Sequence, residues 1–178
     1  MSPASSFPGL ESALIVPALE LAPLVESYRQ CYDLSAPAGI PPHVTVMYPF
    51  LDPNRLTDKV IADLDRLLSN MRAFAYSLVE VREFEGGVLY LAPDPAEPFV
   101  SVTQAVAEAF GVKPYGGVYA RVVPHLTVAQ TADEHERRQI GEAIAHSLPR
   151  EGLASEAWLV VGSNQTAWTR RRSFSFGG

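Results

Sequence analysis

Residues 42–46 read PHVTV and residues 124–128 read PHLTV, so one pattern of proline, histidine, apolar residue, threonine and valine occurs twice. The two histidines, His43 and His125, lie 82 residues apart (125 − 43). With 4 His and 15 Pro in 178 residues, about one shuffled sequence in ten thousand would carry such a pair. The repeat is therefore not a chance occurrence, and the remaining segments can be interpreted outward from it.

Each repeat has the alternation of a β-strand. Successive side chains of a strand point to opposite faces, so His43 and Thr45 share one face while Val44 and Val46 share the other. The second repeat alternates in the same way. Each strand therefore offers an imidazole and a hydroxyl on one side, and Tyr48 is predicted to point with the valines toward the core.

The segments around the first repeat predict the order strand, helix, His-bearing strand, helix, strand. Residues 13–16 form an apolar, β-rich run, and apolar side chains recur every four residues over 24–32. After the repeat, Asp52 and Pro53 are typical of the N-cap and first turn of a helix. Residues 74–84 alternate as a further strand.

The segments around the second repeat predict the same order. Residues 88–91 form a strand stopped by a proline, and residues 99–110 form a helix closed by Gly111. Thr131 and Glu134 are spaced as a capping box for the helix that follows the repeat.

Two strands near 156–162 and 166–176 complete the chain. The shared order of elements indicates an internal duplication, with pseudo-repeat lobes at about 12–85 and 87–176. With 47% hydrophobic residues over this length, we expect one domain that spans residues 1–178.

Charge and cysteine content limit the classes of partner and compartment. The net charge of −6 does not suit a protein that neutralises many phosphates of long duplex nucleic acid, but it permits binding of one small phosphorylated ligand. Cys31 is the single cysteine, so an internal disulfide is excluded and a reducing, intracellular compartment fits best. No Lys or Arg precedes Arg29, and prolines interrupt the apolar N-terminal run. We therefore expect no signal peptide and no membrane span, and a cytoplasmic, monomeric protein.

The two polar pairs have the groups that phosphodiester hydrolysis needs. If a pseudo-twofold axis relates the halves, His43, His125, Thr45 and Thr127 surround one small ligand. One neutral imidazole can take a proton from the attacking water, and the other, protonated, can give one to the leaving oxygen. The threonine hydroxyls can donate to phosphate oxygens. This chemistry requires no metal and no cofactor.

Two other interpretations of the repeats stay open. The strands could be amphipathic, with His and Thr merely on their wetted faces. A metal site would need a third ligand, and no Asp, Glu or His near the repeats recurs in both halves. The remaining histidines, His135 and His146, are predicted to face solvent on their helix and receive no role.

The paired tetrads resemble those of the 2H phosphoesterase superfamily, in particular its bacterial 2′-5′ RNA ligase-like branch, over residues 12–176. The resemblance implies a bilobal, duplicated α+β fold in which two antiparallel sheets face a central cleft with helices outside. It also implies metal-independent hydrolysis of 2′,3′-cyclic phosphates of nucleotides or short RNA ends. It assigns catalysis to His43 and His125, and phosphate binding to Thr45 and Thr127.

The resemblance leaves two further functions open: a 2′-5′ RNA ligase acting on RNA ends, and a non-catalytic nucleotide-binding module. Gln130 stands where members active on RNA often have a basic residue. Together with the net charge, this favours a small cyclic phosphate or a short oligonucleotide end over a folded RNA.

Three further side chains are secondary candidates for ligand contact. Tyr115, in the loop before the second repeat, could stack on a base, with core packing as the alternative. Tyr90 could offer its hydroxyl to a phosphate. Strand alternation places Arg170 and Arg172 on one face, where one of them could meet an RNA end; a solvated edge strand is the alternative.

Overall fold

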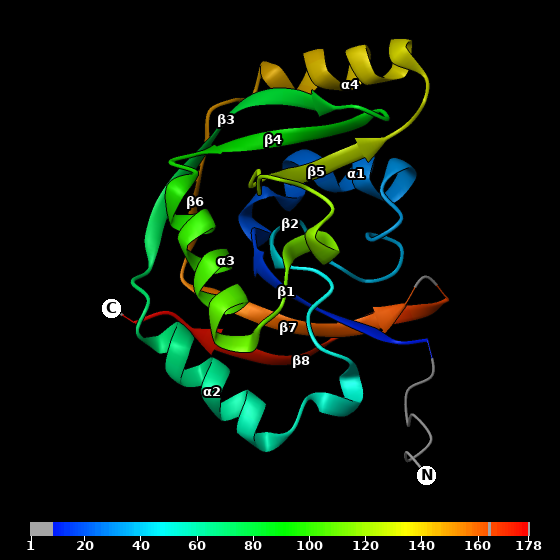
Figure 1. The fold of residues 1–178 in the computed structure, drawn as a ribbon. Helices are drawn as coiled ribbons and strands as arrows, with labels where there is room; N and C mark the ends of the chain where they lie inside the picture. The colour runs from blue at the N-terminus through cyan, green and yellow to red at the C-terminus, as the bar shows by residue number, and fades with distance from the viewer. Residues whose placement is uncertain (1–8, 164, 178) are drawn as a thin grey trace.

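The described residues, 9–163 and 165–177, form two antiparallel four-stranded sheets and four α-helices in a computed structural model (Figure 1). The first sheet has the order β2-β1-β7-β8, and the second has the order β5-β4-β3-β6. The α+β class with two antiparallel sheets is therefore confirmed. The strands are β1 Glu11–Pro17, β2 His43–Met47, β3 Phe74–Phe84, β4 Val88–Asp94, β5 Leu126–Gln130, β6 Arg150–Ala154, β7 Glu156–Ser163 and β8 Thr166–Ser175, and the α-helices are α1 Ala22–Tyr32, α2 Asp58–Ser69, α3 Glu97–Phe110 and α4 Glu134–Ala145.

Each sheet takes strands from both halves of the chain. β3 follows the first repeat but pairs with β4 of the second sheet, and β7, near the C-terminus, pairs with β1 of the first. The helices cross in the same way, because α1 contacts β5 while α3 contacts β2. The two halves are thus interlocked around one large hydrophobic cluster.

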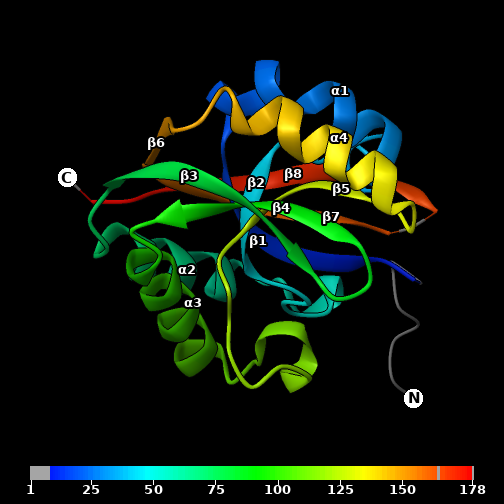
Figure 2. The same ribbon diagram turned by 90° about the horizontal axis from the view of Figure 1, so that it is seen from above.

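The helices lie outside the strands in two pairs. Figure 2 shows α1 and α4 on one side of the strands and α2 and α3 on the opposite side. Each helix buries an apolar stripe. On α1 the most buried positions are Val25 and Arg29, one turn apart, whereas Leu24, Tyr28 and Tyr32 pack only partly against the core. The predicted stripe is therefore displaced by one residue.

Three predicted helix ends can be compared with the structure. Gly111 ends α3 in the left-handed conformation, at φ 64°, as predicted. Asp52 does not begin the long helix: it caps the short 3₁₀ helix Pro53–Arg55, and Thr57 caps α2 instead. That correction follows from the intervening turn, which the apolar spacing of α2 does not reveal.

The predicted capping box before α4 is wrong by two residues. Asp133 is the N-cap, and its carboxylate accepts hydrogen bonds from the backbone of His135 and Glu136. The Thr131 hydroxyl instead donates to the Glu136 carboxylate at 3.0 Å. A carboxylate placed next to the first free N–H groups of a helix is the stronger cap, because it adds charge to the hydrogen bonds.

A β-bulge follows the threonine of each repeat. In the first sheet Thr45 pairs with Ile15 and Met47 pairs with Leu14, so Val46 is the extra residue. Its carbonyl accepts a hydrogen bond of 2.9 Å from Thr103 of α3. In the second sheet the same step occurs between Thr127 and Ala129, with Val128 extra.

The first bulge reverses the predicted direction of Tyr48. Met47 joins the buried side, and Tyr48 turns to the other face, where its hydroxyl donates to Glu11 at 2.7 Å. Tyr48 also contacts Trp168 edge to face, with ring centroids 6.3 Å apart.

None of the helices in the described part of the chain is both long and apolar enough to cross a membrane. The N-terminal segment, for which no signal peptide is expected, begins with residues 1–8, which lie outside the described residues.

Candidate active site

The two predicted His-Thr pairs lie on neighbouring strands. β2 and β5 are edge strands of their respective sheets, and they contact each other. His43 begins β2, and His125 directly precedes β5. All four side chains, with Thr45 and Thr127, are partly accessible. The fold therefore brings together two pairs that are far apart in the sequence. We call the sheet surface that carries each pair its histidine face.

Both imidazoles are oriented by the same backbone contact. Nδ1 of His43 lies 2.8 Å from the carbonyl oxygen of Pro41, and Nδ1 of His125 lies 2.7 Å from that of Val123. A carbonyl oxygen only accepts hydrogen bonds, so Nδ1 carries the proton in both rings. Nε2 of each neutral ring is then left with its lone pair, ready to accept a proton or to bind a ligand.

The surroundings favour the neutral form of both histidines. Burial, together with the nearby Arg29 and His125, lowers the pKa of His43 to about 4, although the hydrogen bond to Pro41 and the Asp33 carboxylate oppose this. Burial also lowers the pKa of His125, against the hydrogen bond to Val123. At neutral pH the unliganded site therefore holds two uncharged imidazoles.

A buried arginine fixes the loop that leads to His43. Arg29 on α1 is 1% exposed and donates to Asp33, Ser35 and the carbonyl of Ile40, at 3.0 to 3.1 Å. A fourth bond, at 3.1 Å, reaches the Glu26 carboxylate. The carbonyl of Pro41, which orients His43, follows directly in the same loop.

An aromatic pair supports His125 on the second sheet. Phe84 and Tyr90 are stacked with ring centroids 4.1 Å apart. The His125 ring meets both edge to face, at 4.9 and 5.5 Å. Tyr90 pairs across the ladder with Thr127, and it is 4% exposed. Its ring therefore forms part of the wall behind the imidazole.

Tyr115 approaches the first His-Thr pair from the loop after α3. Its backbone N–H donates to the carbonyl of Tyr48 at 2.6 Å, and its φ of 52° lies in the left-handed region, which is uncommon for a tyrosine. Burial raises the pKa of Tyr115, while a hydrogen bond from Thr45 lowers it. The structure thus directs the phenol oxygen toward Thr45, and the ring contacts Tyr119 edge to face.

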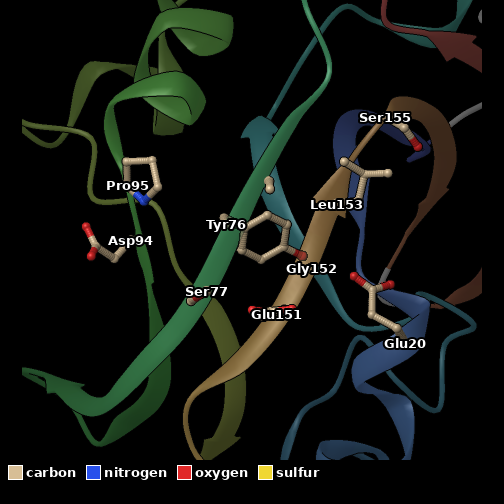
Figure 3. Close-up of a pocket in the computed structure, with 10 residues that line it drawn as sticks. Glu20, Tyr76, Ser77, Asp94, Pro95, Glu151, Gly152, Leu153 and Ser155 are labelled. Atoms are coloured by element: carbon tan, nitrogen blue, oxygen red, sulfur yellow. The ribbon is translucent and has the colours of Figure 1, made fainter.

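A separate cavity of about 800 Å³ is lined mainly by residues of the paired strands β3 and β6 (Figure 3). Glu20, Asp94 and Glu151 line it, and none of the four predicted His and Thr residues does. Tyr76 passes over Gly152 toward Glu20, and within the described residues its buried hydroxyl has no hydrogen-bond partner. Three carboxylates oppose a phosphate, so this cavity is not a second site for the chemistry considered above.

The described residues contain no group of three His, Cys, Asp or Glu side chains arranged to hold a metal ion. His135 and His146 are exposed on α4 and at its end, as predicted.

Two supporting residues were not predicted from the sequence. Arg29 occupies a buried position one turn after Val25, and this helical spacing is the feature of the sequence that could have indicated its burial. Phe84 ends a strand 41 residues before His125 (125 − 84), and nothing local in the sequence connects the two.

The chain is similar to known proteins in both sequence and fold. A family model described as "2'-5' RNA ligase superfamily" matches residues 17–166. Two curated proteins, both named "Putative phosphoesterase", are similar along nearly their whole length. GK0864 of Geobacillus kaustophilus (strain HTA426) is 23% identical over 173 residues, which cover 93% of this chain and 95% of that protein. GWCH70_0799 of Geobacillus sp. (strain WCH70) is 22% identical over 167 residues, which cover 92% and 94%.

Solved structures of E. coli LigT have the same fold. The complex with 3'-AMP superposes with a TM-score of 0.60 at 14% identity, over 96% of this chain and 99% of that one. The apo form gives a TM-score of 0.58 at 14% identity, over 94% and 98%.

Proposed function

Because this chain belongs to the 2′-5′ RNA ligase superfamily, within the 2H phosphoesterases, we propose that it hydrolyses 2′,3′-cyclic phosphates of nucleotides or short RNA ends. The observation that carries the proposal is the matched pair of imidazoles on neighbouring edge strands, each with Nδ1 bound to a carbonyl two residues earlier. Binding alone would not require two proton-transfer groups with the same fixed tautomer. The likeness to proteins named as phosphoesterases supports the same reaction class.

The proposed reaction moves one proton at each histidine. Nε2 of one neutral imidazole accepts a proton from the attacking water as its oxygen bonds to phosphorus. The bond from phosphorus to one ribose oxygen breaks, and the second histidine, protonated, donates to that oxygen. The anionic phosphodiester stabilises this imidazolium, which the unliganded site disfavours. The Thr45 and Thr127 hydroxyls donate to the non-bridging oxygens, whose charge changes in the transition state.

The two rings are alike in their surroundings, so either can act as the acid while the other acts as the base. Burial is the largest cause of the lowered pKa at both rings, and the Arg29 charge adds to the lowering at His43. The family resemblance more often assigns the acid to His43 and the base to His125, and the roles exchange with the orientation of the ligand. Tyr115 adds a third hydroxyl beside Thr45, while base stacking by its ring stays a prediction.

The test is turnover of the four nucleoside 2′,3′-cyclic monophosphates in the presence of EDTA. Wild-type protein should hydrolyse at least one of them with a bell-shaped pH profile. His43→Ala and His125→Ala should each lower kcat by about 10² to 10⁴. His135→Ala, at an exposed histidine on α4, is the matched control. Full activity in either site variant would refute the mechanism.

Two other functions make different predictions in related assays. A ligase would join tRNA half-molecules through a 2′-5′ linkage. A binding module would show a raised Tm with 2′-AMP, 3′-AMP or phosphate, without turnover of any cyclic nucleotide.

A further inference from the structure

Trp158 of β7 lies on the same histidine face as the first His-Thr pair. Ile15 pairs with Thr45 on one side and with Trp158 on the other, so the three side chains form one row across the sheet. Strands in a sheet are about 4.8 Å apart, which puts Trp158 about 10 Å from Thr45. The row therefore leads from a predicted phosphate-binding hydroxyl to a large aromatic ring.

Two neighbours hold the Trp158 ring in a fixed orientation. Its indole N–H donates to the Glu156 carboxylate at 2.9 Å. The guanidinium carbon of Arg170 lies 4.3 Å from the ring centroid, in cation–π contact. The indole ring thus supports the guanidinium group, and both are held in position without a ligand.

Arg170 reaches this position because of a bulge in β8. Leu159 pairs with Arg172 and Val160 pairs with Arg170, so the two arginines follow consecutive positions of β7 and lie on opposite faces. The predicted shared face is therefore wrong, because the alternation is interrupted at Arg171. Arg170 alone of the pair joins the histidine face.

The Arg170 charge is available to a ligand. Its side chain is exposed on β8, the edge strand of the sheet, and in the described residues no carboxylate lies within 4.0 Å of it. Arg171 and Arg172 continue along the same strand and likewise lack an ion pair there. This edge is locally basic in a protein of net charge −6.

We propose that Trp158 and Arg170 bind a second nucleotide of a single-stranded RNA end, next to the nucleotide that carries the cyclic phosphate. A base stacks on the outer plane of the guanidinium, and the guanidinium N–H groups donate to the linking phosphate. A free cyclic mononucleotide has one phosphate and one base, so it cannot use both the threonines and this basic edge. The inference rests on the proposed function and narrows its substrate to short RNA ends.

The experiment compares two substrates that share one cyclic phosphate: a mononucleotide and a trinucleotide that ends in it. The readout is the kcat/KM of the trinucleotide divided by that of the mononucleotide. Loss of one stacked base should lower this ratio about 5- to 150-fold in Arg170→Met and in Trp158→Leu. Arg170 is exposed, so its replacement leaves the fold intact even if the tryptophan variant unfolds. Arg138→Met, at an exposed arginine of α4, should keep the wild-type ratio.

An unchanged ratio in Arg170→Met would overturn this inference while hydrolysis of the mononucleotide still supported the proposed function. If wild-type protein hydrolyses neither substrate, the proposed function fails, and binding decides the inference separately. For that measurement the chain carries Trp168→Phe, which leaves Trp158 as its one tryptophan. A trinucleotide with a terminal 2′-phosphate should quench its fluorescence, and Arg170→Met should weaken that binding by the same factor. No quenching, or quenching unchanged by Arg170→Met, would overturn the inference.

Discussion

Replacing Arg29 with methionine should destabilise the protein and also alter the ionisation of His43. Arg29 is 1% exposed, and its guanidinium satisfies Asp33, Glu26, Ser35 and a loop carbonyl. Methionine fills much of the space but leaves the Asp33 carboxylate, whose side chain is 10% exposed, without its cation and with only its hydrogen bonds from Ser35.

Removing one partner of a buried ion pair costs about 3–5 kcal/mol. For a chain of this length, such a loss lowers Tm by about 6–20 °C. The same change removes a positive charge that lowers the pKa of His43 and frees the Asp33 carboxylate, which raises it. The pKa of His43 should therefore move up, toward the ordinary value of a histidine.

Thermal denaturation and an NMR titration of the His43 ring measure the two effects. Arg66→Met is the matched control, because Arg66 is an exposed helix residue 3.7 Å from Asp63 and should contribute less than about 1 kcal/mol. Arg29→Lys keeps the charge but lacks the planar fork, so it should lose stability and retain a low pKa at His43. A Tm of Arg29→Met within about 2 °C of wild type would refute the reasoning.

Three further predictions concern stability. First, folded His43 binds a proton only near pH 4, whereas in the unfolded chain it does so near pH 6.5. The free energy of unfolding should therefore fall as the pH drops from 6.5 to 4, by up to about 1.4 kcal/mol per pH unit. His43→Gln should reduce this pH dependence, measured by urea denaturation at about pH 7 and pH 5. Second, Thr103→Val leaves a buried carbonyl of β2 without its donor and should cost about 1–3 kcal/mol in urea denaturation; an equal loss in Thr103→Ser would argue against the hydrogen bond as the cause. Third, Gly152→Ala places a Cβ against the ring of Tyr76, 2.6 Å from its hydroxyl oxygen, and should lower the free energy of unfolding by about 1–3 kcal/mol. Gly141→Ala in α4 has room and should raise that free energy by about 0.5–1 kcal/mol. Equal Tm values for the two variants would contradict the packing described for them.

The strands and the paired tetrads could be predicted because their signals are local. A period of two residues places His43 beside Thr45 wherever the strand is regular, and β3 was bounded correctly at Phe74–Phe84 from alternation alone. The family resemblance then supplied the arrangement of two antiparallel sheets. What could not be predicted was the exchange of β3 and β7 between the halves, because it depends on contacts across the whole chain.

The errors near the site have a common physical origin. Alternation predicts the wrong faces for Tyr48 and Arg170 because a bulge shifts it, and bulges are set by the partner strand. Strand β6 was missed because its residues, Arg150–Ala154, are mostly exposed and lack an apolar period. The burial of Arg29 is not predicted because it depends partly on acceptors in a loop that folds back on it, Ser35 and the carbonyl of Ile40.

The extra residue of each bulge is the valine that ends the tetrad. Val46 and Val128 each add one residue to their strand, so the alternation of faces shifts by one position. Up to the bulge the valines point toward the core, and after it Met47 and Ala129 do. Tyr48 and Gln130 therefore become counterparts, each the next side chain on its histidine face. The chain is nearly symmetric at the four groups that would handle phosphate and becomes asymmetric one step later, with a phenol in one half and an amide in the other. A duplicated scaffold can in this way keep identical chemistry at its centre while the two approaches to it diverge.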